Sequence, residues 1–208
     1  MVIKLLVLDC DGILLDSRKP IVQALRDALK SRGYRLSKRV LKELGNGPIE
    51  DVFASVGVRK DDIEEVAKRF EEGKVKRMDM VKAAPWVSVL KGVKVPKIGL
   101  TNNLSPIIRK QLRGVGIGFV HEVLGAERGE SKVVRFRQIL KQQGVRADEV
   151  VYVDDKPAGV ALARKIGCVS VLVPGPAAWA SREEALRAGA DFVVQDLRGV
   201  VKIVRELD

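Results

Sequence analysis

Several residue types that would define a function are scarce in this chain of 208 residues. It has two cysteines and one histidine, so neither a disulfide scaffold nor a zinc site built from paired histidines is expected. Cys10 and Cys168 are far apart and flanked by strand-like residues, which predicts two buried thiols. Because His121 has no obvious nucleophile to assist, acid–base chemistry is expected to come from carboxylates.

Long apolar runs and phosphate-binding glycine loops are absent as well. No run of about 18 apolar residues occurs, and the apolar start MVIKLLVL meets acids with no cleavage site, so no spanning helix or signal peptide is expected. We therefore expect a cytoplasmic protein, either a monomer or a homodimer. No GKS or GKT loop is present, and the glycines at 114–119 precede a strand, which indicates a turn.

Charge is plentiful, with a formal net charge of +11. The basic residues are spread along the chain and aromatic residues make up 4%, so a solvated basic surface is favoured over a base-stacking surface. A basic nucleic-acid-binding module with a vestigial site stays open as an alternative. The 31% of charged residues and the scarcity of asparagine also suit a thermophilic source.

Short apolar runs alternate with helical patterns along most of the chain. The runs lie at 3–8, 97–100, 119–124, 150–153 and 169–173, with a further one at 192–194. Helical patterns follow Ser105 and cover 131–143 and 157–166. This alternation predicts an α/β fold with an open, parallel, Rossmann-like sheet and helices on both faces.

One long interval interrupts this alternation. Between the first two runs the pattern is helical throughout, with glycines marking the turns. This is too much chain for one crossover, so a small all-helical cap is predicted at 18–82. The α/β core is then formed by 1–17 and 83–208.

Polar residues follow three of the predicted strands. Asp9 and Asp11 follow the first, Thr101 and Asn102 the second, and the doublet at 154–155 another. Ligands of α/β sheets bind at the carboxyl ends of the strands, so these residues are expected to converge. Asp and Asn also shape turns and cap helices, which is the alternative for each of them taken alone.

The segments DCDGILLDS, GLTNN and VVYVDDKP, in that order, resemble the haloacid dehalogenase superfamily. The residues at the family's motif positions are Asp9, Asp11, Thr101, Lys132 and Asp155. The resemblance implies that Asp9 attacks phosphorus to give an aspartyl-phosphate. It implies that Asp11 protonates the leaving oxygen and then activates water, whereas the dehalogenating branch lacks this second acid.

Phosphate binding needs positive charge at such a site. A carboxylate ~4 Å from a phosphate dianion is repelled by about 8 kcal/mol at an effective dielectric near 20. The resemblance assigns phosphate binding to Thr101 and Lys132, and Asn102 is expected either to bind phosphate as well or to cap the following helix. The proline that usually follows the family lysine is replaced by Val133, so Arg128 or Lys141 stays an alternative to Lys132.

The expected cofactor is Mg²⁺, which takes oxygen ligands. By resemblance its ligands are Asp9, the backbone carbonyl of Asp11, and Asp155. The family often has another acid four residues after the last of these, where this chain has Gly159. Either Asp154 substitutes for that acid or water fills the position.

Together these features predict a magnesium-dependent phosphatase acting on small phosphate monoesters, such as phosphoglycolate-like compounds, sugar phosphates or nucleotides. A phosphotransferase or phosphomutase of the same family is the alternative. The cap resembles the lid of phosphoglycolate phosphatase-like relatives and is expected to contact the substrate. Arg18, Asn46 and Gly47 are the residues predicted to determine specificity there, although 45–48 also reads as an ordinary turn between helices.

Overall fold

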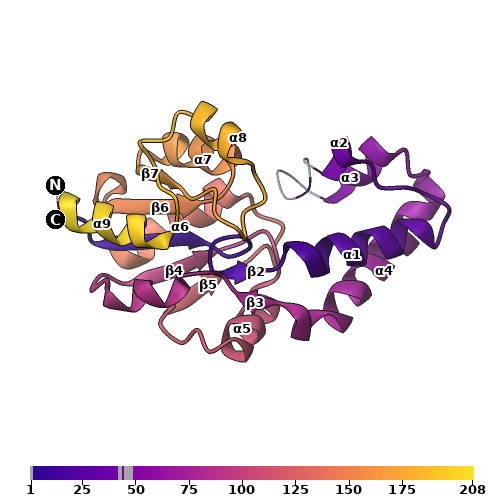
Figure 1. Ribbon diagram of the computed structural model, residues 1–208, viewed down its shortest axis with the longest axis horizontal. Helices are drawn as coiled ribbons and strands as arrows, with labels where there is room; N and C mark the ends of the chain where they lie inside the picture. Colours follow the sequence, from indigo (N-terminus) through magenta and orange to yellow (C-terminus); the bar gives the residue numbers. More distant parts are fainter. Residues whose placement is uncertain (1, 42–43, 45–48) are drawn as a thin grey trace. The chain divides into compact units, whose positions relative to one another are not determined.

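The computed structural model of the protein describes residues 2–41, 44 and 49–208. The chain divides into two compact units, one formed by Met1–Asp16 with Lys82–Asp208 and the other by Ser17–Val81 (Figure 1). We call them the core unit and the helical unit. Within the described ranges, no helix has the length and apolarity needed to cross a membrane.

The core unit is built on a six-stranded sheet with the order β5-β4-β1-β6-β7-β8. The strands are β1 (Leu5–Asp9), β4 (Lys97–Leu100), β5 (Glu122–Leu124), β6 (Val150–Asp154), β7 (Val169–Leu172) and β8 (Phe192–Val193). Every neighbouring pair is parallel. The predicted parallel α/β sheet is therefore confirmed, and β1 lies between β4 and β6, whose carboxyl ends flank its own.

Helices connect these strands and cover the sheet. They are α5 (Ser105–Gly114), α6 (Lys132–Gln143), α7 (Pro157–Ile166), α8 (Arg182–Arg187) and α9 (Leu197–Leu207). Phe136 of α6 and Leu162 of α7 belong to the same hydrophobic core cluster as Leu5 and Val7 of β1. Leu6 and Leu8, whose side chains point to the opposite face of the sheet, are also fully buried. Burial on both faces explains why the sequence of this strand is one continuous apolar run.

The strand predicted at 119–124 is wrong in its first half, because β5 begins at Glu122. β5 is an edge strand, and its partner in the sheet is β4. β4 begins at Lys97, whose carbonyl accepts a hydrogen bond from the His121 backbone amide. Residues 119 and 120 therefore lie before the start of β4 and have no strand opposite them. Cys10 and Cys168 are buried free thiols, as predicted.

A short antiparallel pair was not predicted. It consists of β2 (Leu15–Asp16) and β3 (Lys82–Ala83) of the core unit. In the sequence, β2 directly precedes the helical unit and β3 directly follows it. Asp16 belongs to this pair.

The helical unit contains α1 (Arg18–Lys30), α2 (Lys38–Leu41), α3 (Ile49–Val56) and α4 (Lys60–Lys76). α1 and α4 approach closely where a side chain at Gly73 would come within 3.1 Å of the Ala24 Cβ. Glycine at this position therefore lets the two helices pack tightly.

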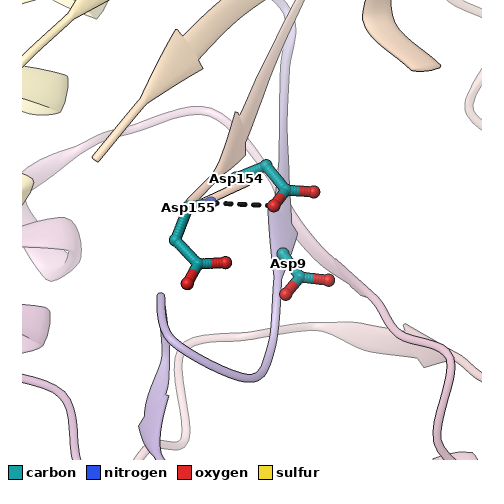
Figure 2. A group of neighbouring side chains, drawn as sticks. All are labelled: Asp9, Asp154 and Asp155. Atoms are coloured by element: carbon teal, nitrogen blue, oxygen red, sulfur yellow. Dashed lines mark hydrogen bonds between the residues drawn. The ribbon is translucent and has the colours of Figure 1, made fainter. Parts of the chain in front are cut away.

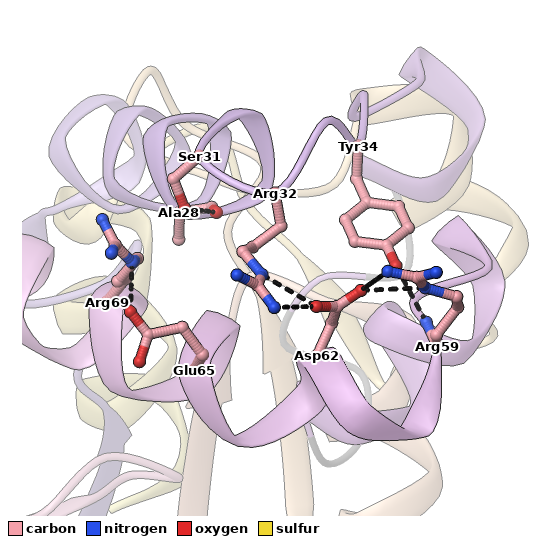
Figure 3. Close-up of polar contacts among 8 residues, drawn as sticks. All are labelled: Ala28, Ser31, Arg32, Tyr34, Arg59, Asp62, Glu65 and Arg69. Atoms are coloured by element: carbon pink, nitrogen blue, oxygen red, sulfur yellow. Dashed lines mark hydrogen bonds and ion pairs between the residues drawn. The ribbon is translucent and has the colours of Figure 1, made fainter.

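Asp62 of α4 is the centre of a polar cluster in the helical unit (Figure 3). The Tyr34 hydroxyl donates to its Oδ2 at 2.6 Å, and Arg59 Nη2 donates to the same oxygen at 3.0 Å. Arg32 Nε donates to Oδ1 at 2.8 Å. The hydrogen bonds from Tyr34 and Arg32 lower the pKa of Asp62 to about 2 despite its burial. The cluster joins the segment after α1 to the first turn of α4.

Candidate active site

Three buried aspartates meet at the carboxyl ends of β1 and β6 (Figure 2). Asp9 is the last residue of β1, Asp154 is the last residue of β6, and Asp155 follows it. The strands are paired in parallel with Leu8 opposite Val153, which places the acids side by side. Each offers a carboxylate oxygen, and these oxygens lie within 4.8 Å of one another. The sequence-predicted convergence of Asp9 with the doublet is thus observed.

Lys132, the first residue of α6, supplies positive charge to this group. Its Nζ donates to Asp9 Oδ1 at 2.5 Å and to the Tyr152 hydroxyl at 3.2 Å, and it lies 3.7 Å from Asp154 Oδ2. Burial lowers the pKa of Lys132, but the carboxylates of Asp9 and Asp154 more than offset this and leave the pKa raised. The lysine is therefore charged at neutral pH and fixes the orientation of Asp9.

Burial dominates the electrostatics of Asp9. It raises the pKa of the Asp9 carboxyl to about 7, against the opposing effect of Lys132 and with a further contribution from Asp154. A second positive charge at this site would favour the ionised carboxylate.

Asp155 is the most deeply buried of the three acids, with 0% of its surface exposed. Its Oδ2 accepts a hydrogen bond from the Trp179 backbone, whereas its Oδ1 has no hydrogen-bond partner among the described residues. Burial, followed by the charges of Asp154 and Asp9, raises the pKa of Asp155 well above the ordinary range. A buried carboxylate oxygen without a donor is the arrangement expected of a cation ligand. Because the three side chains offer only oxygen atoms, the group could hold a hard cation.

Asp154 is held by three hydrogen bonds. The Tyr152 hydroxyl donates to its Oδ2 at 2.5 Å, and the backbone amides of Asp155 and Lys156 donate to its Oδ1 at 2.8 and 3.0 Å. A Cβ atom at Gly159 would lie 2.3 Å from the Asp154 Cβ and 2.4 Å from its Oδ2. Asp154 therefore fills the space that a side chain at position 159 would need.

The segment after β4 forms another wall of the site. Thr101 is buried, and its Oγ1 accepts from the Asn103 backbone at 3.0 Å. Asn102 is exposed, and its Oδ1 accepts from Arg135 Nη2 at 3.0 Å. Arg135 also donates to the Thr101 carbonyl. The side chain of Asn103 donates from Nδ2 to Asp11 Oδ2 at 2.7 Å, which links this segment to the loop after β1.

Three of these contact residues were missed by the sequence reasoning. Tyr152 lies two residues before Asp154 on one strand, so alternation along β6 was a signal that the two share a side. Asn103 stands next to a predicted phosphate-binding residue, but nothing in the sequence indicates a contact with Asp11. Arg135 sits in a helical pattern that predicts a solvated arginine, yet only 3% of its surface is exposed.

The sequence analysis also named Arg128, Lys141 and Arg18, and the structure describes all three. Arg128 and Lys141, the alternatives to Lys132, are both exposed. Arg18 is the exposed first residue of α1 in the helical unit. Asn46 and Gly47 lie outside the described residues.

Comparison with known proteins agrees with this geometry. Residues 6–173 match the model of the haloacid dehalogenase-like hydrolase family. The phosphoglycolate phosphatase of Pectobacterium atrosepticum is 26% identical over 188 residues, which cover 80% of this chain and 78% of that protein. A predicted phosphoglycolate phosphatase from Haemophilus somnus superposes with a TM-score of 0.85 at 18% identity, covering 97% of each chain. A putative β-phosphoglucomutase from Thermotoga maritima superposes with a TM-score of 0.71 at 17% identity, covering 99% of this chain and 100% of that one. The family match spans most of the chain, and the chain belongs to the haloacid dehalogenase-like hydrolase family.

Proposed function

We propose that the protein is a magnesium-dependent phosphatase that hydrolyses small phosphate monoesters through an aspartyl-phosphate on Asp9. The observation that carries this proposal is the pairing of Asp9 with Lys132 inside a buried group of three acids at the carboxyl end of the sheet. A buried carboxylate with a fixed orientation suits a nucleophile, and excess buried acid suits a cation. The family membership and the curated phosphatase relative support the same reaction class.

The residues present fit a magnesium ion. Asp9, Asp154 and Asp155 would hold it, and the family resemblance adds the backbone carbonyl of Asp11. The bound ion would supply positive charge that offsets the repulsion between Asp9 and the phosphate. Asp154 is proposed to take the place of the acid that Gly159 lacks, because it occupies the space beside that glycine.

The chain's own residues account for both chemical steps. In the first, a carboxylate oxygen of Asp9 bonds to phosphorus, the bond from phosphorus to the ester oxygen breaks, and Asp11 gives its proton to that oxygen. In the second, Asp11 takes a proton from water as the water oxygen bonds to phosphorus and the bond to Asp9 breaks. Inorganic phosphate is released, and both aspartates return to their initial states.

Phosphate oxygens would be held by Lys132, Thr101 and Asn102. Because the Thr101 oxygen already accepts from a backbone amide, its hydroxyl proton can be directed at a phosphate oxygen. Because Arg135 donates to the side-chain oxygen of Asn102, the NH₂ group of that amide is the part left to donate to phosphate. Donors fixed before the substrate binds stabilise the charge that develops on the transferring group.

The substrate is proposed to be a small phosphorylated metabolite. A phosphoglycolate-like compound is one candidate beside sugar phosphates and nucleotides, since the curated relative is a phosphoglycolate phosphatase. The helical unit, with Arg18, Asn46 and Gly47, is proposed to act as the cap that selects among them. We propose that the enzyme works in the cytoplasm as a monomer or a homodimer.

Release of phosphate from p-nitrophenyl phosphate tests the proposal, with magnesium or with a chelator. The wild type is expected to turn over only with the metal, and Asp9→Asn is expected to be inactive. Asp148→Asn is the matched control, because Asp148 is an ion-paired surface residue on the short 3-10 helix before β6. A folded wild type without turnover would favour a phosphotransferase if it phosphorylates a sugar hydroxyl, or the nucleic-acid-binding module if it binds DNA with steep salt dependence.

A further inference from the structure

We propose that Asn103 is a positioning residue for the general acid: its side-chain amide holds the Asp11 carboxyl where it can protonate the leaving oxygen. This inference rests on the proposed phosphatase function. It assigns a role to a residue for which the sequence predicted none.

The contact joins two loops at the carboxyl end of the sheet. Asn103 Nδ2 donates to Asp11 Oδ2 at 2.7 Å, between residues that are 92 positions apart in the chain. Asp11 follows β1 and Asn103 follows β4, and these strands are neighbours with Asp9 opposite Leu100. Both residues are half-buried, so the bond is partly shielded from water.

The backbone of Asn103 is fixed on both sides. Its amide donates to Thr101 Oγ1 at 3.0 Å, and its carbonyl accepts from the Ala126 amide at 3.0 Å. A Cβ atom at Gly125 would lie 2.6 Å from that carbonyl oxygen, so the two loops approach at a distance that only glycine allows. The side chain of Asn103 therefore extends toward Asp11 from a rigid base.

Arg135 holds the preceding two residues of the same loop. Its buried guanidinium donates to the Thr101 carbonyl and to Asn102 Oδ1, and its Nε donates to the Glu130 carbonyl at 3.1 Å. The loop is thus attached to α6, the helix that begins with Lys132. One rigid segment aligns the phosphate-binding groups and, through Asn103, the acid.

An amide is suited to this task because it donates a hydrogen bond and does not itself titrate. General acid catalysis contributes about 10²- to 10⁴-fold, and it requires the proton donor within hydrogen-bond reach of the leaving oxygen. Without Asn103 the Asp11 side chain would be less well oriented, and displacement of a reacting group by ~1 Å can cost about 10²-fold. The loss should depend on how much the leaving group needs a proton.

The test compares two esters of similar shape, p-nitrophenyl phosphate and phenyl phosphate. Nitrophenolate is a stable anion that leaves with little help, whereas phenolate is more basic and needs the proton more. Asn103→Ala is expected to lower kcat/KM for phenyl phosphate about 10-fold more than for p-nitrophenyl phosphate, which is a modest part of the full general-acid contribution. The ratio kcat/KM is used because it reports phosphoryl transfer to Asp9 without the later attack of water.

Gln23→Ala is the matched control. It removes an amide-to-carboxylate hydrogen bond of 2.8 Å, from Gln23 to Asp27 in the helical unit, and is expected to leave both ratios unchanged. If the wild type is active and a folded Asn103→Ala protein loses kcat/KM equally for both esters, or loses none, the inference is wrong. If the wild type hydrolysed neither ester, the proposed function would fail and this inference with it.

Discussion

Replacement of Gly159 by alanine is expected to destabilise the protein, although alanine normally favours a helix. Gly159 is the third residue of α7 and lies in its first turn, where Gly→Ala stabilises by at most the value of about 1 kcal/mol that applies to a helix interior. Here the added methyl group would lie 2.3 Å from the Asp154 Cβ and 2.4 Å from its carboxylate. Those atoms are not the far end of a flexible chain, so Asp154 or the helix must move.

The size of the effect follows from what Asp154 would lose. Overpacking a buried site costs about 1–3 kcal/mol. A hydrogen bond to a charged group contributes about 1.5–3 kcal/mol, and moving Asp154 endangers the bond from Tyr152. Set against a gain of up to about 1 kcal/mol from helix propensity, the two costs together leave a loss of about 1.5–5 kcal/mol.

Urea unfolding followed by tryptophan fluorescence measures this loss, because Trp86 and Trp179 both lie in the core unit. Two further variants test whether the loss comes from the clash with Asp154. Gly114→Ala places a methyl group at the end of α5 with no atom within 4 Å apart from its chain neighbours and the backbone of its own helix, so it is expected to be neutral or stabilising. In an Asp154→Gly background, the clash is removed and Gly159→Ala is expected to stabilise. If Gly159→Ala stabilised the wild type as well, the explanation of this glycine would be wrong.

Three other predictions follow from the site and from the helical unit. Lys132→Ala is expected to lower kcat for an aryl phosphate about 10²- to 10³-fold, whereas Lys141→Ala, an exposed residue of the same helix, should have no effect on phosphate release. Magnesium is expected to raise the urea midpoint of the wild type and to raise that of Asp155→Asn much less; equal shifts would contradict the ligand assignment. The Tyr34 hydroxyl and its neighbouring arginines lower the pKa of Asp62 to about 2 in the folded protein, against about 3.9 in an unfolded chain. Asp62 therefore contributes stability that is complete above about pH 4 and is lost as the pH falls toward 2, so Asp62→Asn should be less stable at pH 7 and should lose less on acidification, as circular dichroism would show.

The sheet could be predicted because its strands are apolar on both faces and its helices are periodic. The segments around β1, β4, β6 and β7 were each recognised from such runs. α9 was not predicted, although five of its residues are buried. It comes directly after the apolar run at 192–194, which was interpreted as a strand, and no functional motif lies within it. The convergence of Asp9 with the doublet after β6 followed from a rule about where parallel strands end.

The finer contacts of the site could not be predicted from the sequence. The space at Gly159 is limited by the side chain of Asp154, which lies beside the glycine in the folded chain. The burial of Arg135 depends on three carbonyl oxygens from two different segments. Each of these contacts is set by tertiary packing, which local patterns of charge and periodicity do not encode.

The central claim, that Asp9 is the nucleophile, can be tested most directly by locating the covalent intermediate. The wild type would be mixed with a ³²P-labelled aryl phosphate and magnesium, quenched in acid during turnover and digested, and the labelled peptide would be sequenced. We predict label on the peptide that contains Asp9, with no label in Asp9→Asn. Label on another residue, or its absence from an enzyme that turns over, would contradict the aspartyl-phosphate mechanism.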